Sequence, residues 1–175
     1  PRLKISTDLD AHLMNILGSP VHLSKTIMNL VSNAAEAMPD GGTITITTRS
    51  GYVDHPIKGY DHVLPGDYTV LAVADSGMGI RAEDQTRIFE PFFSKKKMGR
   101  SGTGLGLSVV WATVQDHKGY LDLQSKPGQG TTFTLYFPVT GQAPSARKRP
   151  PGVEDLCGYG EKILVVDDLA QQREI

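Results

Sequence analysis

The apolar residues at the start of the chain follow first a strand pattern and then a helical one. Residues 2–9 alternate between apolar and polar side chains, which predicts a strand. Ser19 and Pro20 are typical of a helix start, because serine caps a helix well and proline fits its first turn. Apolar residues then recur at helical spacing over 21–38, and the Pro-Asp-Gly-Gly sequence at 39–42 stops the pattern. We therefore expect a strand followed by one long helix.

The middle of the chain contains two strand patterns. Residues 43–49 (TITITTR) are rich in β-branched side chains, and residues 68–75 (YTVLAVAD) form an apolar run. We expect these two segments to pair as strands that are joined by a polar loop over 50–67. A short helix is expected over 81–89. Residues 90–103 contain three consecutive lysines and two glycines without any period, which predicts a mobile loop.

The last third of the chain changes from a folded pattern to a linker. Residues 104–117 have a helical pattern, and residues 119–125 and 131–138 are expected to form a final hairpin. Residues 140–160 are polar and contain prolines, as linkers do. Residues 161–168 (EKILVVDD) then predict a new strand. The expected organisation is a folded domain over 1–139, a linker over 140–160 and the truncated start of a second domain over 161–175.

Composition and charge fit a globular domain and give no sign of other classes. Apolar residues make up 39% and charged residues 21%, and the net charge of −1 suggests neither a nucleic-acid partner nor direct membrane contact. No apolar run is long enough to span a bilayer, and no signal-peptide pattern is present. The single cysteine, Cys157, excludes an intrachain disulfide and suits a reducing compartment, so we expect a cytoplasmic location. Because the chain begins at Pro1 and stops in mid-pattern, we interpret it as a piece of a larger protein.

Two asparagines on the first long helix are candidate ligands. Asn29 and Asn33 are four residues apart, so they share one helix face. Carboxamide oxygens are hard, neutral ligands that suit magnesium, which also binds waters and phosphate oxygens. Solvated or capping asparagines are the alternative, and the pair by itself does not decide between them.

The segment that ends the second predicted strand is a candidate binding turn. Asp75 follows a buried run, so its carboxylate should face a hydrogen-bond donor, such as an amine on a ligand. Gly77 and Gly79 would let a ligand approach the backbone closely. An ordinary turn after a strand explains the same residues equally well.

A glycine-rich segment leads into the last predicted helix. Gly102, Gly104, Leu105 and Gly106 precede a helix whose free N–H groups and dipole would suit a phosphate, and basic residues at 95–100 add positive charge. A flexible solvated loop is the alternative. The dinucleotide-binding fingerprint is not completed here, and the absence of a GK[ST] sequence excludes a P-loop nucleotide site.

Taken together and in order, these segments resemble the GHKL ATP-binding fold, in particular its histidine-kinase branch. The likeness covers roughly residues 1–139. The segments that carry it are an N box at 29–37 (NLVSNAAEA), a first G box at 75–79 (DSGMG), an F box at 89–93 (FEPFF), a second G box at 102–107 (GTGLGL) and a closing strand at 130–135 (GTTFTL). The resemblance implies a two-layer α/β sandwich, with a mixed sheet under three helices and ATP held between the helices and a lid.

The same resemblance implies roles for individual residues. Asn33 would ligate Mg²⁺, and Asn29 would contact phosphate or metal. Asp75 would accept a hydrogen bond from the adenine amino group, in a pocket shaped by Gly77 and Gly79. The remaining expected ATP contacts are the lid residues Gly102, Gly104, Leu105 and Gly106, the base-pocket residue Thr131, and the lid cation Lys96, for which Lys95 and Lys97 are alternatives.

The end of the chain resembles the first strand of a response-regulator receiver, with Asp167 and Asp168 as its acidic pair. The resemblance therefore implies a hybrid kinase whose partners are a receiver domain and a histidine-bearing dimerisation domain, in a homodimeric parent. None of the five histidines lies in the family's phospho-acceptor motif, so no catalytic residue is expected within this chain. The stimulus, the cognate regulator and any membrane anchor of the parent cannot be read from the sequence.

Two other functions compete with a kinase domain. GHKL ATPases, such as those of gyrases, heat-shock chaperones and mismatch-repair proteins, carry a glutamate base where this chain has Asn29. A carboxamide cannot take a proton at neutral pH, which argues against efficient hydrolysis. A scaffold that has lost ATP binding is the third possibility, and Asn33 and Asp75 argue against it.

Overall fold

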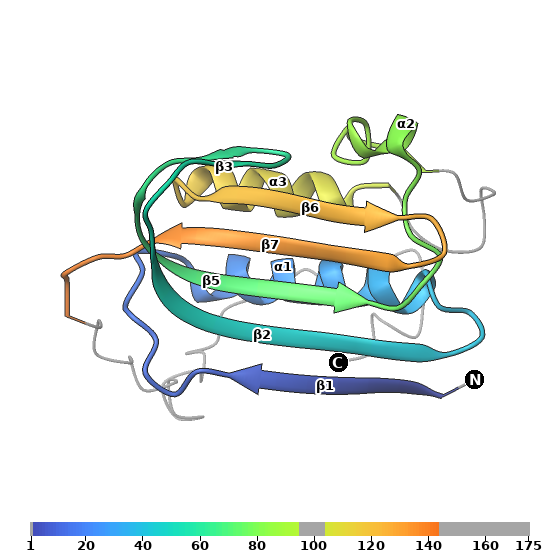
Figure 1. Cartoon of the computed structure of the whole chain (residues 1–175), viewed down its shortest axis with the longest axis horizontal. Helices are drawn as coiled ribbons and strands as arrows, with labels where there is room; N and C mark the ends of the chain where they lie inside the picture. The colour runs from blue at the N-terminus through green and yellow to red at the C-terminus, as the bar shows by residue number, and fades with distance from the viewer. Residues whose placement is uncertain (1, 95–103, 144–175) are drawn as a thin grey trace, which may run out of the picture. The chain divides into compact units, whose positions relative to one another are not determined.

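The computed structural model of the chain describes residues 2–94 and 104–143, which form a sheet and a helical layer (Figure 1). The sheet has five strands in the order β1-β2-β5-β7-β6. Neighbouring strands are antiparallel except for β1 and β2, which are parallel. The strand bounds are β1 Leu3–Leu9, β2 Gly42–Val53, β5 Gly66–Asp75, β6 Tyr120–Lys126 and β7 Gly130–Pro138, and a separate short pair consists of β3 Ile57–Lys58 and β4 His62–Val63.

Two helices cover one face of the sheet, as Figure 1 shows: α1 (Pro20–Glu36) and α3 (Gly106–Asp116). Ser19 caps α1 as the sequence predicts, because its hydroxyl accepts from the backbone N–H of His22 at 3.4 Å. The layer between the helices and the sheet is the core, and its fully buried side chains include Leu30, Ile44, Val110, Val114, Leu121 and Leu135. The predicted two-layer fold with a mixed sheet is confirmed.

The predicted loop over 50–67 is wrong in its extent. β2 and β5 pair as far as Val53 and Gly66, and the hairpin of β3 and β4 occupies most of the remaining connection. Val63 on this hairpin is fully buried against Tyr68 and Val70, on the sheet face opposite to α1 and α3. Ile57 and Val63 of the hairpin therefore cover part of the second face of the sheet, and such isolated positions produce no regular strand pattern.

Two helices are shorter than predicted. The segment 81–89 contains only a single turn, α2 (Ala82–Gln85), before the chain bends. The bend allows the adjacent side chains of Ile88 and Phe89 both to enter the core. The helix α3 begins at Gly106 because Gly104 has a φ of +70°, which is outside the helical range. In the described part of the chain, no helix is both long and apolar enough to cross a bilayer.

Candidate functional site

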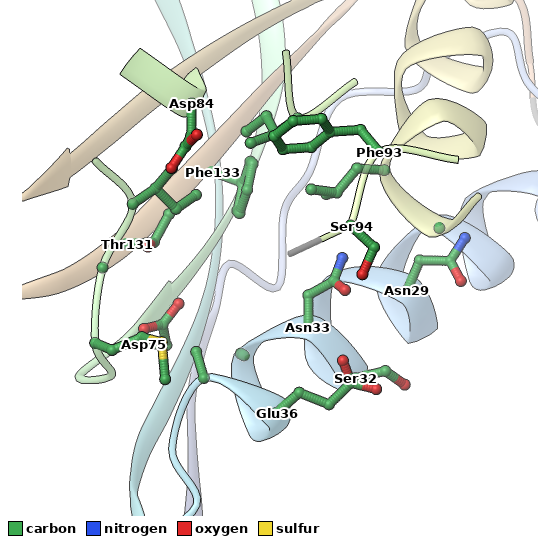
Figure 2. Close-up of a pocket in the computed structure, with 18 of the residues that line it drawn as sticks. Asn29, Ser32, Asn33, Glu36, Asp75, Asp84, Phe93, Ser94, Thr131 and Phe133 are labelled. Carbon is green, nitrogen blue, oxygen red and sulfur yellow. The ribbon is translucent and has the colours of Figure 1, made fainter. Parts of the chain in front are cut away.

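A pocket of about 590 Å³ lies between α1, the turn that follows β5 and the start of α3 (Figure 2). This volume is within the range of sites for small ligands. The predicted site residues that line the pocket are Asn29, Asn33, Asp75, Gly79, Gly104, Gly106 and Thr131. Gly77 and Leu105 lie beside the lining rather than in it, and Lys96 and Gly102 fall outside the described residues. The fold thus brings together residues from all the motifs on which the ATP-site prediction rests, apart from the undescribed segment.

The side of the pocket formed by α1 carries the carboxamides. Asn29 and Asn33 project from the same helix face, next to Ser32 and Glu36 (Figure 2). The Nδ2 atom of Asn33 is buried, and no hydrogen-bond partner for it occurs within residues 2–94 and 104–143. A buried polar atom without a partner costs about 1–3 kcal/mol, so this position favours a ligand that supplies the missing interaction. Because amide orientations are assigned from such contacts, the Asn33 amide can also turn its oxygen into the pocket.

The sheet side of the pocket carries a half-buried carboxylate. Asp75 ends β5 opposite Thr131 of β7, and both lie on the sheet side of the pocket in Figure 2. Burial raises the pKa of Asp75 above its ordinary value of 3.8, while hydrogen bonds from the backbone N–H groups of Gly77 and Thr131 oppose the rise. The Gly77 N–H donates to Oδ1 at 2.8 Å. An ionised carboxylate in this position is destabilised by desolvation, and a donor on a bound ligand would offset that cost.

Close backbone contacts explain two of the glycines around the pocket. Gly79 has a φ of +68°, and a Cβ there would collide with the carbonyl oxygen of Lys126. Gly104 has a φ of +70°, and a Cβ there would lie 2.7 Å from the carbonyl carbon of Phe92. Since L side chains rarely adopt this backbone region, both positions require glycine for conformation as well as for space.

Residues that sequence reasoning missed hold the turn after β5 in place. Ser125 accepts at its hydroxyl from the Ile80 N–H at 2.8 Å, and it donates to the Gly130 carbonyl at 3.1 Å. Its hydroxyl also lies 2.9 Å from Oγ1 of Thr131. The amide of Gln85 donates to the carbonyls of Ile80 and Ser125, both at 3.1 Å. No motif marks Ser125 or Gln85, since their partners are brought close only by the fold.

The apolar wall of the pocket was also missed. Its side chains are Met78, Ile80, Ile88, Phe93, Leu107 and Phe133. The guanidinium of Arg87 lies 4.8 Å from the centre of the Phe93 ring, a cation–π contact that orients this ring at the edge of the pocket. An apolar wall opposite a few polar groups suits a flat aromatic ligand group.

Ionisable side chains do not form a conventional metal site in the described residues, where no group of three or more histidine, cysteine, aspartate and glutamate side chains could hold a metal ion. The start of α3 lies next to Asn29, because a Cβ on Gly106 would be 3.7 Å from the Asn29 amide oxygen. Backbone N–H groups at a helix start favour anions. The helical end of the pocket is therefore suited to phosphate oxygens, which could supply most of the ligands of a hard cation.

Comparison with known proteins places this geometry in a family. The family described as histidine kinase-, DNA gyrase B-, and HSP90-like ATPases matches residues 18–141. The sensor kinase CckA of Brucella abortus is 39% identical over 150 residues, which are 81% of this chain and 16% of that protein. The sensor histidine kinase ZraS of Klebsiella oxytoca is 40% identical over 131 residues, which are 74% of this chain and 25% of that protein. The chain therefore spans only a small part of these relatives.

Solved structures show the same fold. The nucleotide-free catalytic domain of the histidine kinase ThkA matches with a TM-score of 0.61 and 26% identity, over 78% of this chain and 79% of that one. Full-length ShkA in complex with AMPPNP matches with a TM-score of 0.61 and 24% identity, over 81% of this chain and 27% of that one. The match to ThkA covers most of both chains, so the likeness is to a catalytic domain rather than to a whole kinase.

Proposed function

Because this chain belongs to the family of histidine kinase-, DNA gyrase B- and HSP90-like ATPases and corresponds to the catalytic domain of sensor histidine kinases, we propose that it binds ATP with Mg²⁺ and transfers the γ-phosphoryl group to a histidine on another domain. The proposal rests on the different chemistry of the two sides of the pocket. A half-buried carboxylate lies on its sheet side, and paired carboxamides lie next to a helix start on the other.

The sheet side of the pocket suits adenine. Asp75 presents oxygen acceptors to the exocyclic amine, and the ring would pack against the apolar wall that includes Ile88 and Phe133. Thr131 adds a hydroxyl that Ser125 holds at 2.9 Å. The base would thus be recognised by residues whose positions are fixed before ATP binds, which lowers the entropic cost of binding.

The helical side suits the phosphates. Gly104 and Gly106 bring backbone close to the pocket at the start of α3, where N–H groups favour negative charge. Asn29 and Asn33 fit a magnesium ion that takes most of its ligands from phosphate and water, and the ion would neutralise charge on the transferred group. The roles of Lys96 and Gly102 stay predictions.

The proposal also concerns parts of the parent protein that lie outside this chain. A histidine on a separate dimerisation domain would receive the phosphoryl group, in a homodimer that also carries a receiver domain after residue 161. The comparisons support the kinase alternative over the ATPase one, and the carboxamide of Asn29 agrees, since it cannot act as a base for water.

One set of measurements tests the proposal. ATP binding, phosphate release and phosphoryl transfer to an added histidine-containing dimerisation domain are measured on the same preparation. We expect binding, little phosphate release, and transfer only with the added domain. Asn33→Ala should lose the magnesium-dependent part of binding and abolish transfer, whereas Asn15→Ala, outside the pocket, should change neither. Rapid phosphate release without any acceptor would instead favour an ATPase, and failure to bind ATP would refute the proposal.

A further inference from the structure

A short turn that belongs to none of the sequence motifs is hydrogen-bonded to the edge strand of the sheet. Residues Gly59–Asp61 join β3 to β4 and run along β6, the last strand of the sheet. The Asp61 N–H donates to the Leu121 carbonyl at 3.0 Å, and the Leu121 N–H donates back to Asp61 Oδ2 at 3.3 Å. The Tyr60 N–H donates to Oδ1 of the buried Asp122 at 3.2 Å. These bonds fix the backbone on both sides of Tyr60.

Gly59 shows how tightly the turn is seated. A Cβ at this position would collide with the carboxylate of Asp122, so any other residue would displace either the turn or this carboxylate. The carboxylate of Asp122 is itself held by the side-chain amide of Gln124 at 3.1 Å. The position of Tyr60 therefore follows from the edge of the sheet and not from a flexible loop.

The ring of Tyr60 reaches the helical layer of the fold. Its centre lies 4.7 Å from that of Phe89 and 5.5 Å from that of Trp111, with interplanar angles of 62° and 80°. Phe89 and Trp111 also contact each other, with ring centres 5.5 Å apart. Burial and the nearby carboxylates of Asp61 and Glu90 raise the pKa of Tyr60, so its hydroxyl stays neutral in this cluster.

The cluster of Tyr60, Phe89 and Trp111 touches two walls of the nucleotide pocket from behind. Phe89 packs edge-on against Phe133, with ring centres 6.3 Å apart, and Phe133 lines the pocket. Trp111 belongs to α3, the helix whose first residues, Gly106 and Leu107, line the pocket. Tyr60 itself does not line the pocket, so it can act on a ligand only through its neighbours.

We infer that Tyr60 is a positioning residue for the nucleotide site: its ring keeps the start of α3 and the Phe133 wall at the spacing that ATP requires. The inference rests on the proposed function, because it assumes that the pocket binds ATP. Removing the ring would leave a void beside Phe89 and Trp111, and α3 would relax into it. Small displacements of positioned donors weaken binding strongly, so Tyr60→Ala should bind ATP about tenfold more weakly, which corresponds to about 1.4 kcal/mol.

Calorimetry with ATP and Mg²⁺ tests the inference on the parent chain and on Tyr60→Ala, Tyr60→Phe and Tyr120→Ala, with a thermal unfolding curve for each. Tyr120 is the matched control, because it also lies at the edge strand β6 but packs against Tyr68 in the cluster on the other face. We expect Tyr60→Phe to bind ATP with the affinity of the parent chain, because it keeps the ring. We expect Tyr120→Ala to lose stability without losing affinity for ATP. If Tyr60→Ala does not fold, Tyr60→Leu keeps the apolar volume without the aromatic contacts and should bind ATP more weakly.

The outcomes distinguish a failure of the inference about Tyr60 from a failure of the proposed function. The inference is overturned if Tyr60→Ala, or Tyr60→Leu in its place, binds ATP as tightly as the parent chain does. It is also overturned if the loss of affinity relative to the loss of melting temperature is the same in Tyr60→Ala and Tyr120→Ala. If the parent chain itself does not bind ATP, the proposed function fails and this inference fails with it.

Discussion

Asp75 lowers the stability of the fold at neutral pH, and it also has a proposed role in binding ATP. Desolvation raises its pKa above the ordinary value of 3.8, and the N–H groups of Gly77 and Thr131 only partly oppose this. The folded chain therefore binds the carboxyl proton more tightly than the unfolded chain does. Folding is favoured by protonation of Asp75 at acidic pH, and this contribution is lost as the pH rises through the pKa of the folded state. At neutral pH the ionised carboxylate reduces stability.

The first prediction follows from the raised pKa of Asp75 in the folded chain. Asp75→Asn should unfold at a higher temperature than the parent at neutral pH, because the neutral amide avoids the cost of the buried charge. The gain should shrink as the pH is lowered toward the pKa of Asp75. Thermal unfolding from acidic to neutral pH checks it, and a variant less stable than the parent at neutral pH would contradict it.

The second prediction concerns the base. Guanine presents a carbonyl where adenine presents an amine, so GTP would place two acceptors face to face at Asp75. Such a mismatch costs about 1–3 kcal/mol, or roughly 5- to 150-fold in affinity. ATP should therefore bind more tightly than GTP by about this factor, and Asp75→Ala should weaken ATP similarly. Competition calorimetry measures both, and equal affinity for the two nucleotides would remove Asp75 from the site.

Individual site residues differ in how visible they are in the sequence. Asp75 and the glycines stand out because they belong to motifs that follow one another in the order typical of the family, although an ordinary turn would explain each one alone. Ser125 and Tyr60 carry no such mark. Their partners are Ile80 and Phe89, far along the chain, so only the completed fold shows what they hold.

At the scale of elements, His117 joins the two main helices. Its Nε2 accepts from the Ser19 N–H at 2.9 Å, and its Nδ1 lies 2.7 Å from the Thr113 carbonyl. Since a carbonyl only accepts, Nδ1 is the donor in this contact. Gly18 packs against the ring so closely that a Cβ there would be 2.6 Å from it. The end of α3 thus sets where α1 begins.

The third prediction tests this link. His117→Ala should lower the free energy of unfolding by about 1–3 kcal/mol, because the partly buried Ser19 N–H loses its acceptor and Phe137 loses a ring contact. Urea unfolding measures the change. His22→Ala is the control, since His22 is exposed and its stability effect should stay within about 0.5 kcal/mol. Equal unfolding midpoints for the two variants would show that the link contributes nothing.

Elements were predictable where the apolar pattern is regular. The strand β5 follows a continuous apolar run and the helix α1 a helical period, and both lie within a few residues of the predicted bounds. The hairpin of β3 and β4 was missed because single residues such as Val63 cover the second sheet face without a repeating pattern. The helix predicted over 81–89 is short because core packing of Phe89 overrides its helical pattern.

At the scale of the whole molecule, the proposed nucleotide site lies in this chain, and the resemblance implies that the acceptor histidine lies elsewhere. The fourth prediction is that this chain alone, incubated with labelled ATP, incorporates no stable phosphohistidine. Label should appear only when a matching dimerisation domain is added, and then on that domain. Acid-labile label on any of the five histidines of this chain, at a catalytic rate, would contradict the prediction.

The expectations for the basic part of the lid and for the receiver-like end concern residues outside the described ranges, and they stay predictions.

The strand β7 comes last among the described strands, yet it lies between β5 and β6. During synthesis, β5 therefore keeps an unpaired edge until Gly130–Pro138 leaves the ribosome, and the core lacks Phe133 and Leu135 until then. Exposed strand edges and apolar faces of this kind pair wrongly with other chains. The nascent domain thus has its greatest need of chaperones until residues 130–138 have been made, and a chain truncated before residue 130 has a central strand without a partner on one side.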